Sequence, residues 1–260
     1  MSRQINQSVF TVLSSEKVGP HMLRRRFAVD SIEPFAASGA TDAYVKLCFD
    51  DDGNPIIPEG GPRSEPRPVL RTYTIHSVDA DASEASIDFV VHGDEGVASP
   101  WAARAEAGER IGVVGPGGAY APDEDADWHL FVGDDTALPA IISALRALPD
   151  HSRVQVVVES LDPERDLPVE CHQCVHWLPQ GDVPCEALVD YVQRTLPWPE
   201  GRVDVFAHGE AHAMMKRLRP WFIGERGVDR RTMSLSGYWR VGRTEEAFRE
   251  WKQANKPGDD

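Results

Sequence analysis

Short apolar stretches recur through the first half of the chain, separated by Gly, Pro and Asp. In one of them Ile87, Phe89 and Val91 recur at every second position, which is the spacing of a half-buried β-strand. About six such strands with turn signals between them predict a closed antiparallel barrel. The predicted strands cover Val9–Leu13, Met22–Val29, Ala43–Phe49, Leu70–Ile75, Ser86–Val91 and Ile111–Val114.

The pattern changes after the acidic, Pro-bearing segment YAPDEDAD at residues 120–127, where strands begin to alternate with helices. This alternation predicts a mainly parallel sheet with helices on both faces. We therefore expect two domains, residues 1–122 and residues 123–260. The predicted strands are Trp128–Val132, Val154–Glu159, Val203–Ala207 and Thr232–Tyr238, and the predicted helices are Thr136–Leu148, Cys185–Thr195, Glu210–Gly224 and Thr244–Gln253.

The chain carries a net charge of −15, from 42 acidic and 27 basic side chains. A field of that sign disfavours nucleic acid and anionic membrane surfaces as partners. No apolar run approaches the roughly 20 residues that span a bilayer, and the N-terminus lacks the charged-then-apolar layout of a secretory signal. We therefore expect a cytoplasmic protein with neither a nucleic-acid nor a membrane partner.

Four cysteines occur, at Cys48, Cys171, Cys174 and Cys185. In a cytosolic protein we expect them to be reduced. Cys171, Cys174 and Cys185 have neighbouring histidines and resemble a metal or iron–sulfur site, but the spacing lacks a clear second pair. We assign no metal site here, and a cluster protein stays a distant alternative.

The run Arg71-Thr-Tyr73-Thr74 begins a predicted barrel strand. A flavin needs a flat aromatic neighbour for its ring and a cation near its phosphates. Residues 71 and 73 point to the same side of a strand, so one strand can present both groups. The alternative is an exposed arginine and a tyrosine used for packing, because so short a motif also occurs by chance.

A glycine-containing turn and then a short helix are predicted at residues 92–106. Gly93 and Gly96 allow tight turns and the close approach of a ligand to the backbone. Ser99 is a good N-cap, and Pro100 suits the first helical position. The free N–H groups and the dipole at such a helix start favour a pyrophosphate, with a well-capped structural helix as the alternative.

These two motifs belong to a longer set of runs that match a known family. The runs are RTYTIHSV, IDFVVHGDEGVASPWAARAEAGERIGVVGPGG, LFVGDDTALPAI, VFAHGEAHAMMKRLR and LSGYWRVG. Through them the sequence resembles the siderophore-interacting proteins, which are FAD-dependent ferric-siderophore reductases related to ferredoxin–NADP reductases. The resemblance spans nearly the whole chain. It implies an antiparallel FAD-binding β-barrel at residues 1–122, followed by a parallel-sheet NAD(P)H-binding α/β domain at residues 123–260.

The resemblance also implies which residues contact FAD, with Ala98 and Ser99 at its pyrophosphate. The implied FAD-contacting residues are Arg71, Tyr73, Thr74, His92, Ala98 and Ser99.

The nicotinamide cofactor, NADPH or NADH, is expected at the carboxyl ends of the parallel strands. No G-x-G-x-x-G follows the first of them, where Thr136 can cap the next helix instead. The resemblance implies that this turn and the Gly209-Glu210 turn lie near the nicotinamide, although Asp135 stands where the family more often has Glu. It also implies that Trp239 reaches back toward the flavin, where it covers the ring or lines the substrate cleft, with core packing as the alternative.

Ferric catecholate complexes are often anionic, so their binding requires basic side chains despite the acidic charge of the whole chain. The candidates are Lys46, Arg240 and Arg243, of which Lys46 matches a position where the family carries a lysine. An ordinary surface cation is the alternative for each of them.

The function implied by the resemblance is transfer of electrons from NAD(P)H through FAD to a ferric siderophore, with release of iron(II) in the cytoplasm. Such electron transfer needs little acid–base machinery, so no catalytic side chain is predicted. A ferredoxin-like protein is an alternative electron donor. Two other interpretations stay open: a general NAD(P)H:flavin or quinone oxidoreductase of the same fold, and a non-catalytic siderophore-binding protein.

Overall fold

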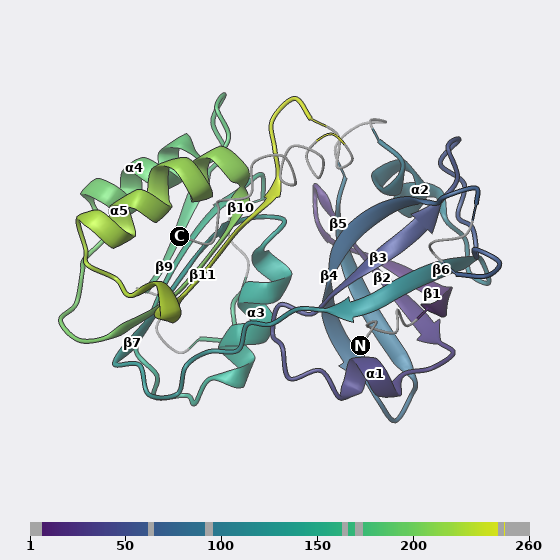
Figure 1. Ribbon diagram of the computed structural model, residues 1–260, viewed down its shortest axis with the longest axis horizontal. Coiled ribbons are helices and arrows are strands. Elements are labelled where there is room, and N and C mark those ends of the chain that lie inside the picture. Colours follow the sequence, from purple (N-terminus) through teal and green to yellow (C-terminus); the bar gives the residue numbers. More distant parts are fainter. Residues whose placement is uncertain are drawn as a thin grey trace. The chain divides into compact units, whose positions relative to one another are not determined.

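The computed structural model describes residues 7–61, 65–91, 96–162, 166–169, 174–243 and residue 247. The chain gathers into two compact units (Figure 1). The first contains the chain up to Pro122 together with Leu138–Pro149, and the second contains a parallel sheet.

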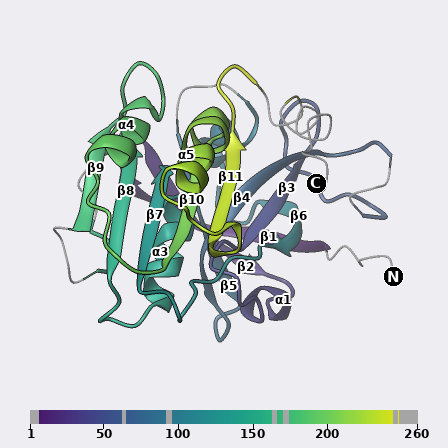
Figure 2. The same cartoon turned by 60° about the vertical axis from the view of Figure 1, so that its left-hand side comes forward.

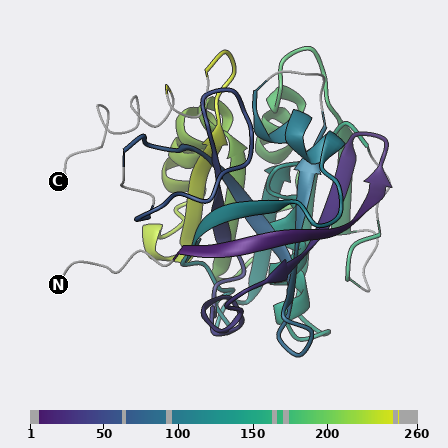
Figure 3. The same ribbon diagram turned by 90° about the vertical axis from the view of Figure 1, so that its right-hand side faces the viewer.

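Six antiparallel strands close into a barrel in the order β1-β2-β5-β4-β3-β6 (Figures 1 and 3). The strands are β1 (Gln7–Gly19), β2 (Met22–Val29), β3 (Tyr44–Phe49), β4 (Val69–Asp79), β5 (Glu84–Val90) and β6 (Arg110–Gly117). Each predicted strand overlaps one of them, so the predicted barrel is confirmed. Two short helices also belong to this part of the chain, α1 at Glu33–Ala36 and α2 at Ala98–Arg104.

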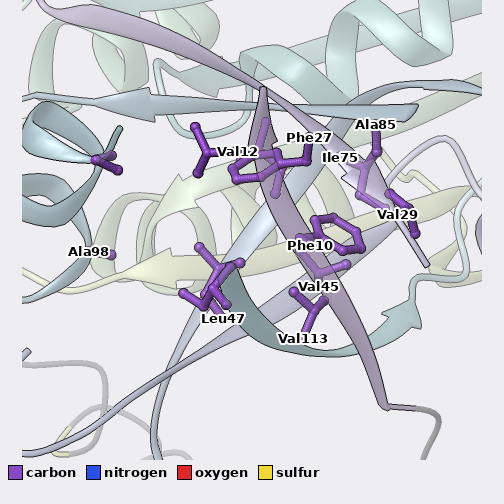
Figure 4. Packing of buried hydrophobic residues seen from close by; sticks show 14 of the residues in the cluster. Phe10, Val12, Phe27, Val29, Val45, Leu47, Ile75, Ala85, Ala98 and Val113 are labelled. Carbon is purple, nitrogen blue, oxygen red and sulfur yellow. The ribbon is translucent and has the colours of Figure 1, made fainter. Parts of the chain in front are cut away.

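Side chains that alternate inward along each strand fill the barrel. In β3, Val45 and Leu47 are fully buried, whereas Lys46 between them is only half-buried. Figure 4 shows Val45 and Leu47 in the same cluster as Phe10 and Phe27, which come from the first two strands. The two-residue period of the sequence therefore decides which face of each strand enters the core.

The strand β4 changes its partner along its length. Its described ladder with β3 runs from Val69 to Thr74, and its ladder with β5 runs from Ile75 to Asp79. The β4–β5 ladder has a register shift between Ile75 and Ser77, which marks His76 as a bulge residue. The half of β4 that carries Arg71 and Tyr73 is thus held by β3, and the other half by β5.

Arg24, His76 and Asp88 form a polar cluster at this bulge. Asp88 accepts two hydrogen bonds from the Arg24 guanidinium, at 2.6 and 2.8 Å. Nδ1 of His76 lies 3.2 Å from Nη2 of Arg24 and 3.3 Å from Oδ2 of Asp88. Burial lowers the pKa of His76 to about 4, because desolvation of the imidazolium outweighs the attraction of Asp88. His76 is therefore neutral at pH 7 and can accept a hydrogen bond from Arg24.

Replacing His76 with Asn is expected to flatten the pH dependence of the free energy of unfolding between pH 6.5, the ordinary pKa of histidine, and about pH 4. In this range the unfolded chain protonates His76 and the folded chain does not, so the unsubstituted protein loses stability as the pH falls. One such group contributes a slope of up to about 1.4 kcal/mol per pH unit.

Denaturant unfolding of both proteins across this range measures the difference. The matched control is H21N, which removes an exposed histidine of the same barrel. Equal slopes for H76N and the unsubstituted protein would contradict a buried neutral His76.

Five parallel strands form the sheet of the second unit, in the order β11-β10-β7-β8-β9 (Figure 2). The strands are β7 (Trp128–Asp134), β8 (Val154–Ser160), β9 (Val175–Pro179), β10 (Val203–Glu210) and β11 (Met233–Trp239). The predicted parallel sheet is confirmed. The strand β9 was not predicted, because it is a short edge strand whose positions are half-buried or exposed rather than alternating.

Helices cover one face of this sheet. α4 (Glu186–Arg194) packs on β8 and β9, and the π-helix η2 (Ala213–Leu218) packs on β10 and β11. α5 (Arg219–Gly224) continues η2 and lies beside α4 (Figures 1 and 2). α3 (Leu138–Ala147) follows β7 and packs on β4 of the first unit. A 3-10 turn, η3 (Arg230–Thr232), precedes β11.

The helix predicted at Glu210–Gly224 begins later than expected. Glu210 is the last residue of β10, and its carboxylate accepts a hydrogen bond from the backbone N–H of Ala213 at 2.8 Å. The side chain thus caps the helix from the end of the strand. The helix predicted at Thr244–Gln253 lies outside the described residues apart from Ala247. Within the described part of the chain, no helix has the length and apolar character needed to cross a membrane.

Candidate functional site

Arg71 and Tyr73 share one face of β4, as their spacing predicts. They pair with Leu47 and Val45 of β3, whose side chains fill the barrel. The ring centroid of Tyr73 lies 4.5 Å from that of the buried Phe89. The Arg71 side chain is half-buried. One face of this strand therefore presents an aromatic ring and a cation.

Thr74 lies on the opposite face of β4. It pairs with Tyr44 of β3 and is buried. A ligand could meet Thr74 and Tyr73 together only along the edge of the strand, because successive side chains of a strand point to opposite faces.

The helix α2 begins two residues earlier than predicted. Its N-cap is Val97 and its first residue is Ala98, so the predictions that Ser99 caps the helix and that Pro100 opens it are wrong. Gly96, with a φ of 78°, supplies the left-handed turn that directs the chain into the helix at Val97.

Ser99 instead lies in the first turn of α2, and the residue is only 6% exposed. Its hydroxyl has no hydrogen-bond partner among the described residues. The N–H groups of a first turn have no acceptors within their own helix. Because a buried polar group without a partner costs about 1–3 kcal/mol, this turn favours a ligand that supplies acceptor oxygens.

The barrel holds α2 through two buried side chains. Trp101 is fully buried and packs against the rings of Phe89 and other core aromatic residues. Arg25 of β2 donates from Nε to the carbonyl oxygen of Ala102 at 2.8 Å, and from Nη2 to the same oxygen. Sequence reasoning missed Arg25. The available signal was its place two residues before the buried Phe27, which puts it on the inward face of the strand.

In the second unit, Asp134 lies at the carboxyl end of β7 and gathers several donors. The indole Nε1 of Trp239 donates to its Oδ2 at 2.7 Å. The backbone N–H and the hydroxyl of Thr136 donate to its Oδ1 at 2.9 and 2.5 Å. Burial raises the pKa of Asp134, against these hydrogen bonds. Sequence reasoning also missed Asp134, although a carboxylate at a strand end beside Thr136 was visible.

The carboxylates of Glu159 and Glu210, at the ends of β8 and β10, accept hydrogen bonds from backbone N–H groups of the protein itself. Glu159 accepts a hydrogen bond from the N–H of Cys185 at 2.5 Å, at the start of α4, and burial raises the pKa of Glu159. Glu210 accepts from Ala213 and lies 3.4 Å from Nη1 of Arg240. The structure therefore pairs Glu210 and Arg240, which the sequence assigned to different ligands.

The other predicted substrate residues lie in different surroundings. Lys46 is half-buried on the outer face of β3, opposite Thr72. Arg243 is exposed beyond β11, and its backbone N–H donates to the carbonyl oxygen of Arg240 at 3.1 Å. His92, predicted to line the FAD site, lies outside the described residues.

The cysteines differ in redox state. Cys174 is disulfide-bonded, whereas Cys48 and Cys185 are free and buried. The expectation that all four are reduced is therefore wrong for Cys174. Because metal ligation requires a thiolate, Cys174 is removed from the cluster alternative. The described residues contain no group of three or more side chains placed to hold a metal ion.

Comparison with known proteins identifies both parts of the chain. Residues 11–120 match the siderophore-interacting FAD-binding domain, and residues 126–242 match the siderophore-interacting protein. The ferric vibriobactin reductase ViuB of Vibrio cholerae is 31% identical over 80% of each chain. This chain belongs to the siderophore-interacting protein family.

Two further relatives span almost the whole chain. The protein Rv2895c of Mycobacterium tuberculosis is 41% identical and covers 94% of each chain. The crystal structure of a siderophore utilization protein from T. fusca is 32% identical, with a TM-score of 0.79, and covers 92% of this chain and 95% of its own. The predicted family, its fold and its FAD cofactor are confirmed.

The described residues of this siderophore-interacting protein fit FAD. The buried Ser99 hydroxyl and the first-turn N–H groups suit phosphate oxygens, which are strong acceptors. The face of β4 with Arg71 and Tyr73 belongs to the same compact unit as α2. Phe89 connects the two, since its ring lies 4.5 Å from Tyr73 and 6.0 Å from Trp101. Phe89 thus links the aromatic face of β4 to the core that holds α2.

Replacing Ser99 with Ala is expected to raise the Kd for FAD about tenfold, because a hydrogen bond to a charged group contributes about 1.5–3 kcal/mol. The same change should leave the FAD-free protein equally stable or slightly more stable, since it removes a buried hydroxyl that lacks a partner. Titration of the FAD-free protein with FAD measures the Kd, and thermal unfolding measures the stability.

The matched control is S77A, which removes an exposed serine of β4 whose hydroxyl lies 2.6 Å from that of Ser86. Its Kd for FAD should not change. An S99A protein that is destabilised without FAD, with an unaltered Kd, would show that the hydroxyl serves the fold instead of the ligand.

Proposed function

We propose that this protein is an FAD-dependent reductase that transfers electrons from NAD(P)H to a ferric siderophore and releases iron(II) in the cytoplasm. The observation that carries the proposal is the first turn of α2, where a buried hydroxyl without a described partner stands beside the core that holds Tyr73. The named functions of the relatives support the reaction. They include ferric vibriobactin reductase in Vibrio cholerae and NADPH-dependent ferric-chelate reductase in Escherichia coli.

Residues 1–122 act as the FAD-binding domain in this proposal. Ala98 and Ser99 hold the pyrophosphate, Arg71 balances its charge, and Tyr73 and Thr74 contact the flavin. His92 completes the proposed set. FAD, when bound, supplies the conversion of two-electron to one-electron chemistry. The chain itself needs no general acid or base for this task, and it acts by binding and orienting its ligands.

Residues 123–260 act as the NAD(P)H-binding domain. The donor lies at the carboxyl ends of β7 and β10, near Thr136, Gly209 and Trp239, where parallel sheets bind dinucleotides. Glu210 acts there indirectly, because its carboxylate caps η2 and pairs with Arg240. A ferredoxin-like protein is the alternative donor.

The substrate is a ferric siderophore, whose hard oxygen donors favour iron(III) over iron(II). Reduction by one electron therefore weakens the hold of the siderophore on the metal. Lys46, Arg240 and Arg243 are the cations assigned to an anionic complex. Arg240 already shares its charge with Glu210, whose Oε1 lies 3.4 Å from Nη1 of Arg240.

Anaerobic stopped-flow absorbance tests the proposed reaction. NADPH, NADH or a reduced ferredoxin is mixed with the FAD-loaded protein, and loss of the flavin absorbance identifies the donor. The reduced protein is then mixed with ferric siderophores, free flavin or quinones. We expect the fastest reoxidation with ferric siderophores. Faster reoxidation by quinones or free flavin would instead support a general oxidoreductase, and a protein that binds siderophore but never FAD would support a carrier.

Replacing Lys46 with Ala is expected to raise the apparent KM for an anionic ferric siderophore several-fold while leaving the FAD content unchanged, because the lysine lies on the outer face of β3. Steady-state kinetics with an anionic and a neutral siderophore measure the effect, which should be small for the neutral complex. K17A, which removes an exposed lysine of β1, is the matched control. Loss of bound FAD in K46A would count against this assignment.

A further inference from the structure

The hydrogen bond between Trp239 and Asp134 crosses an intervening strand. Trp239 ends β11 and Asp134 ends β7, and β10 lies between these two strands in the sheet. The indole Nε1 nevertheless donates to Oδ2 of Asp134 at 2.7 Å, joining residues 105 positions apart in the sequence. The contact therefore passes over the carboxyl end of β10.

Gly209 of β10 leaves the space that this contact uses. A Cβ atom at Gly209 would lie 2.6 Å from Oδ2 of Asp134 and 3.0 Å from its Cγ. The φ of Gly209 is 150°, which side-chain-bearing residues rarely adopt. Any side chain at this position would displace the carboxylate oxygen that receives the indole N–H.

A register shift sets the position of Trp239. In the β10–β11 ladder Gly209 pairs with Gly237, but Glu210 pairs with Trp239 and not with Tyr238. An extra residue in one strand bends it and re-aims the side chains that follow, as bulges beside functional sites commonly do. The shift brings Trp239 level with the end of β10.

Asp134 is fixed by donors from other elements as well. Its Oδ1 accepts from the N–H and the hydroxyl of Thr136, and the thiol of Cys185 lies 3.7 Å from its Oδ2. Asp134 as a whole residue is 8% exposed. Together these contacts fix the orientation of the Asp134 carboxylate. Because the Trp239 indole donates to this carboxylate, they also fix the indole.

The hydrogen bond between Trp239 and Asp134 lies where the strand order of the sheet reverses. From β7 the chain proceeds to β8 and β9 on one side of β7, and then to β10 and β11 on the other. Ligands of such sheets bind at the carboxyl ends of the strands at this switch point. The second strand of such a domain receives the adenosine ribose of a dinucleotide, which places the nicotinamide end toward β10 and β11. Asp134 and Gly209 stand on the two sides of the switch point, with the Trp239 indole across it.

We propose that Asp134 is a positioning residue that holds the Trp239 indole as a receiving surface for the nicotinamide end of the donor, with a preference for its oxidised, cationic ring. An indole is the best aromatic partner for a cation, and a carboxylate that accepts its N–H increases the negative character of the ring face. Asp135 and Glu210 are further acidic side chains at this edge, and Arg240 shares the charge of Glu210. This inference rests on the proposed use of a nicotinamide donor.

The test measures ligand binding to the FAD-loaded protein by titration calorimetry. The ligands are NAD(P)⁺, which has a cationic ring, a tetrahydro analogue with a neutral ring, and ADP-ribose or its 2′-phosphate, which lack the ring. D134N and W239F should each weaken NAD(P)⁺ binding about fivefold to tenfold, as the magnitude of cation–π contacts suggests. Each substitution should weaken binding of the neutral-ring analogue less, and it should leave the affinity for the ADP-ribose ligands unchanged.

A double variant completes the test. If the two side chains act through one shared hydrogen bond, D134N/W239F should lose no more affinity than either single variant. The matched control is W198F, which removes an indole of the same unit that packs against Trp128 and Arg226 and should leave all the ligands unaffected. W239F keeps an aromatic ring and Asp134, so it remains informative if D134N does not fold.

The outcomes separate this inference from the proposed function. The positioning role alone would be overturned if the unsubstituted protein bound all the ligands but the single variants lost as much affinity for ADP-ribose as for NAD(P)⁺. Additive losses of NAD(P)⁺ affinity in the double variant would overturn it as well. Failure of the unsubstituted protein to bind any of these ligands would overturn both this role and the use of a nicotinamide donor.

Discussion

The placement of α2 by the barrel core is the constraint on which the flavin side of this protein depends. Trp101 is buried among core rings, and the Arg25 guanidinium binds the carbonyl of Ala102. A seven-residue helix would not be stable alone, because most helical stability in proteins comes from packing. With these contacts in place, the first turn is held rigidly enough to keep the Ser99 hydroxyl buried. Its unmet hydrogen-bonding capacity is then available to a ligand.

In the parallel sheet, by contrast with the Ser99 hydroxyl, the buried carboxylates have partners within the protein. Its carboxyl edge carries buried acidic side chains, but each of these is bound to donors of the chain itself, as Glu159 is to the start of α4 and Glu210 is to Ala213. A buried carboxylate is tolerated when hydrogen bonds satisfy it. These acidic groups therefore stabilise the turns at the carboxyl edge of the sheet. In the reductase proposed above, direct recognition of the electron donor is therefore assigned to backbone groups and to the indole of Trp239.

Much of the architecture could be predicted from local patterns. Period-two alternation marked the barrel strands because one face of each strand must enter the core, as Val45 and Leu47 do. The change to alternating strands and helices marked the parallel sheet. The elements that escaped prediction, α1 and β9, are short and carry too few buried positions to show a period. The shared face of Arg71 and Tyr73 also followed from spacing alone.

The sequence by itself determined which side of each strand is apolar, that a turn rich in glycine leads into a helix near Ser99, and that the chain resembles one family. Only the tertiary structure decided that this helix begins at Ala98, that Arg25 holds it, and that Asp134 meets Trp239 across Gly209. The physical reason is that a local period reports burial on one element. Partners far apart in the sequence depend on strand order and register, which appear only when the elements pack together.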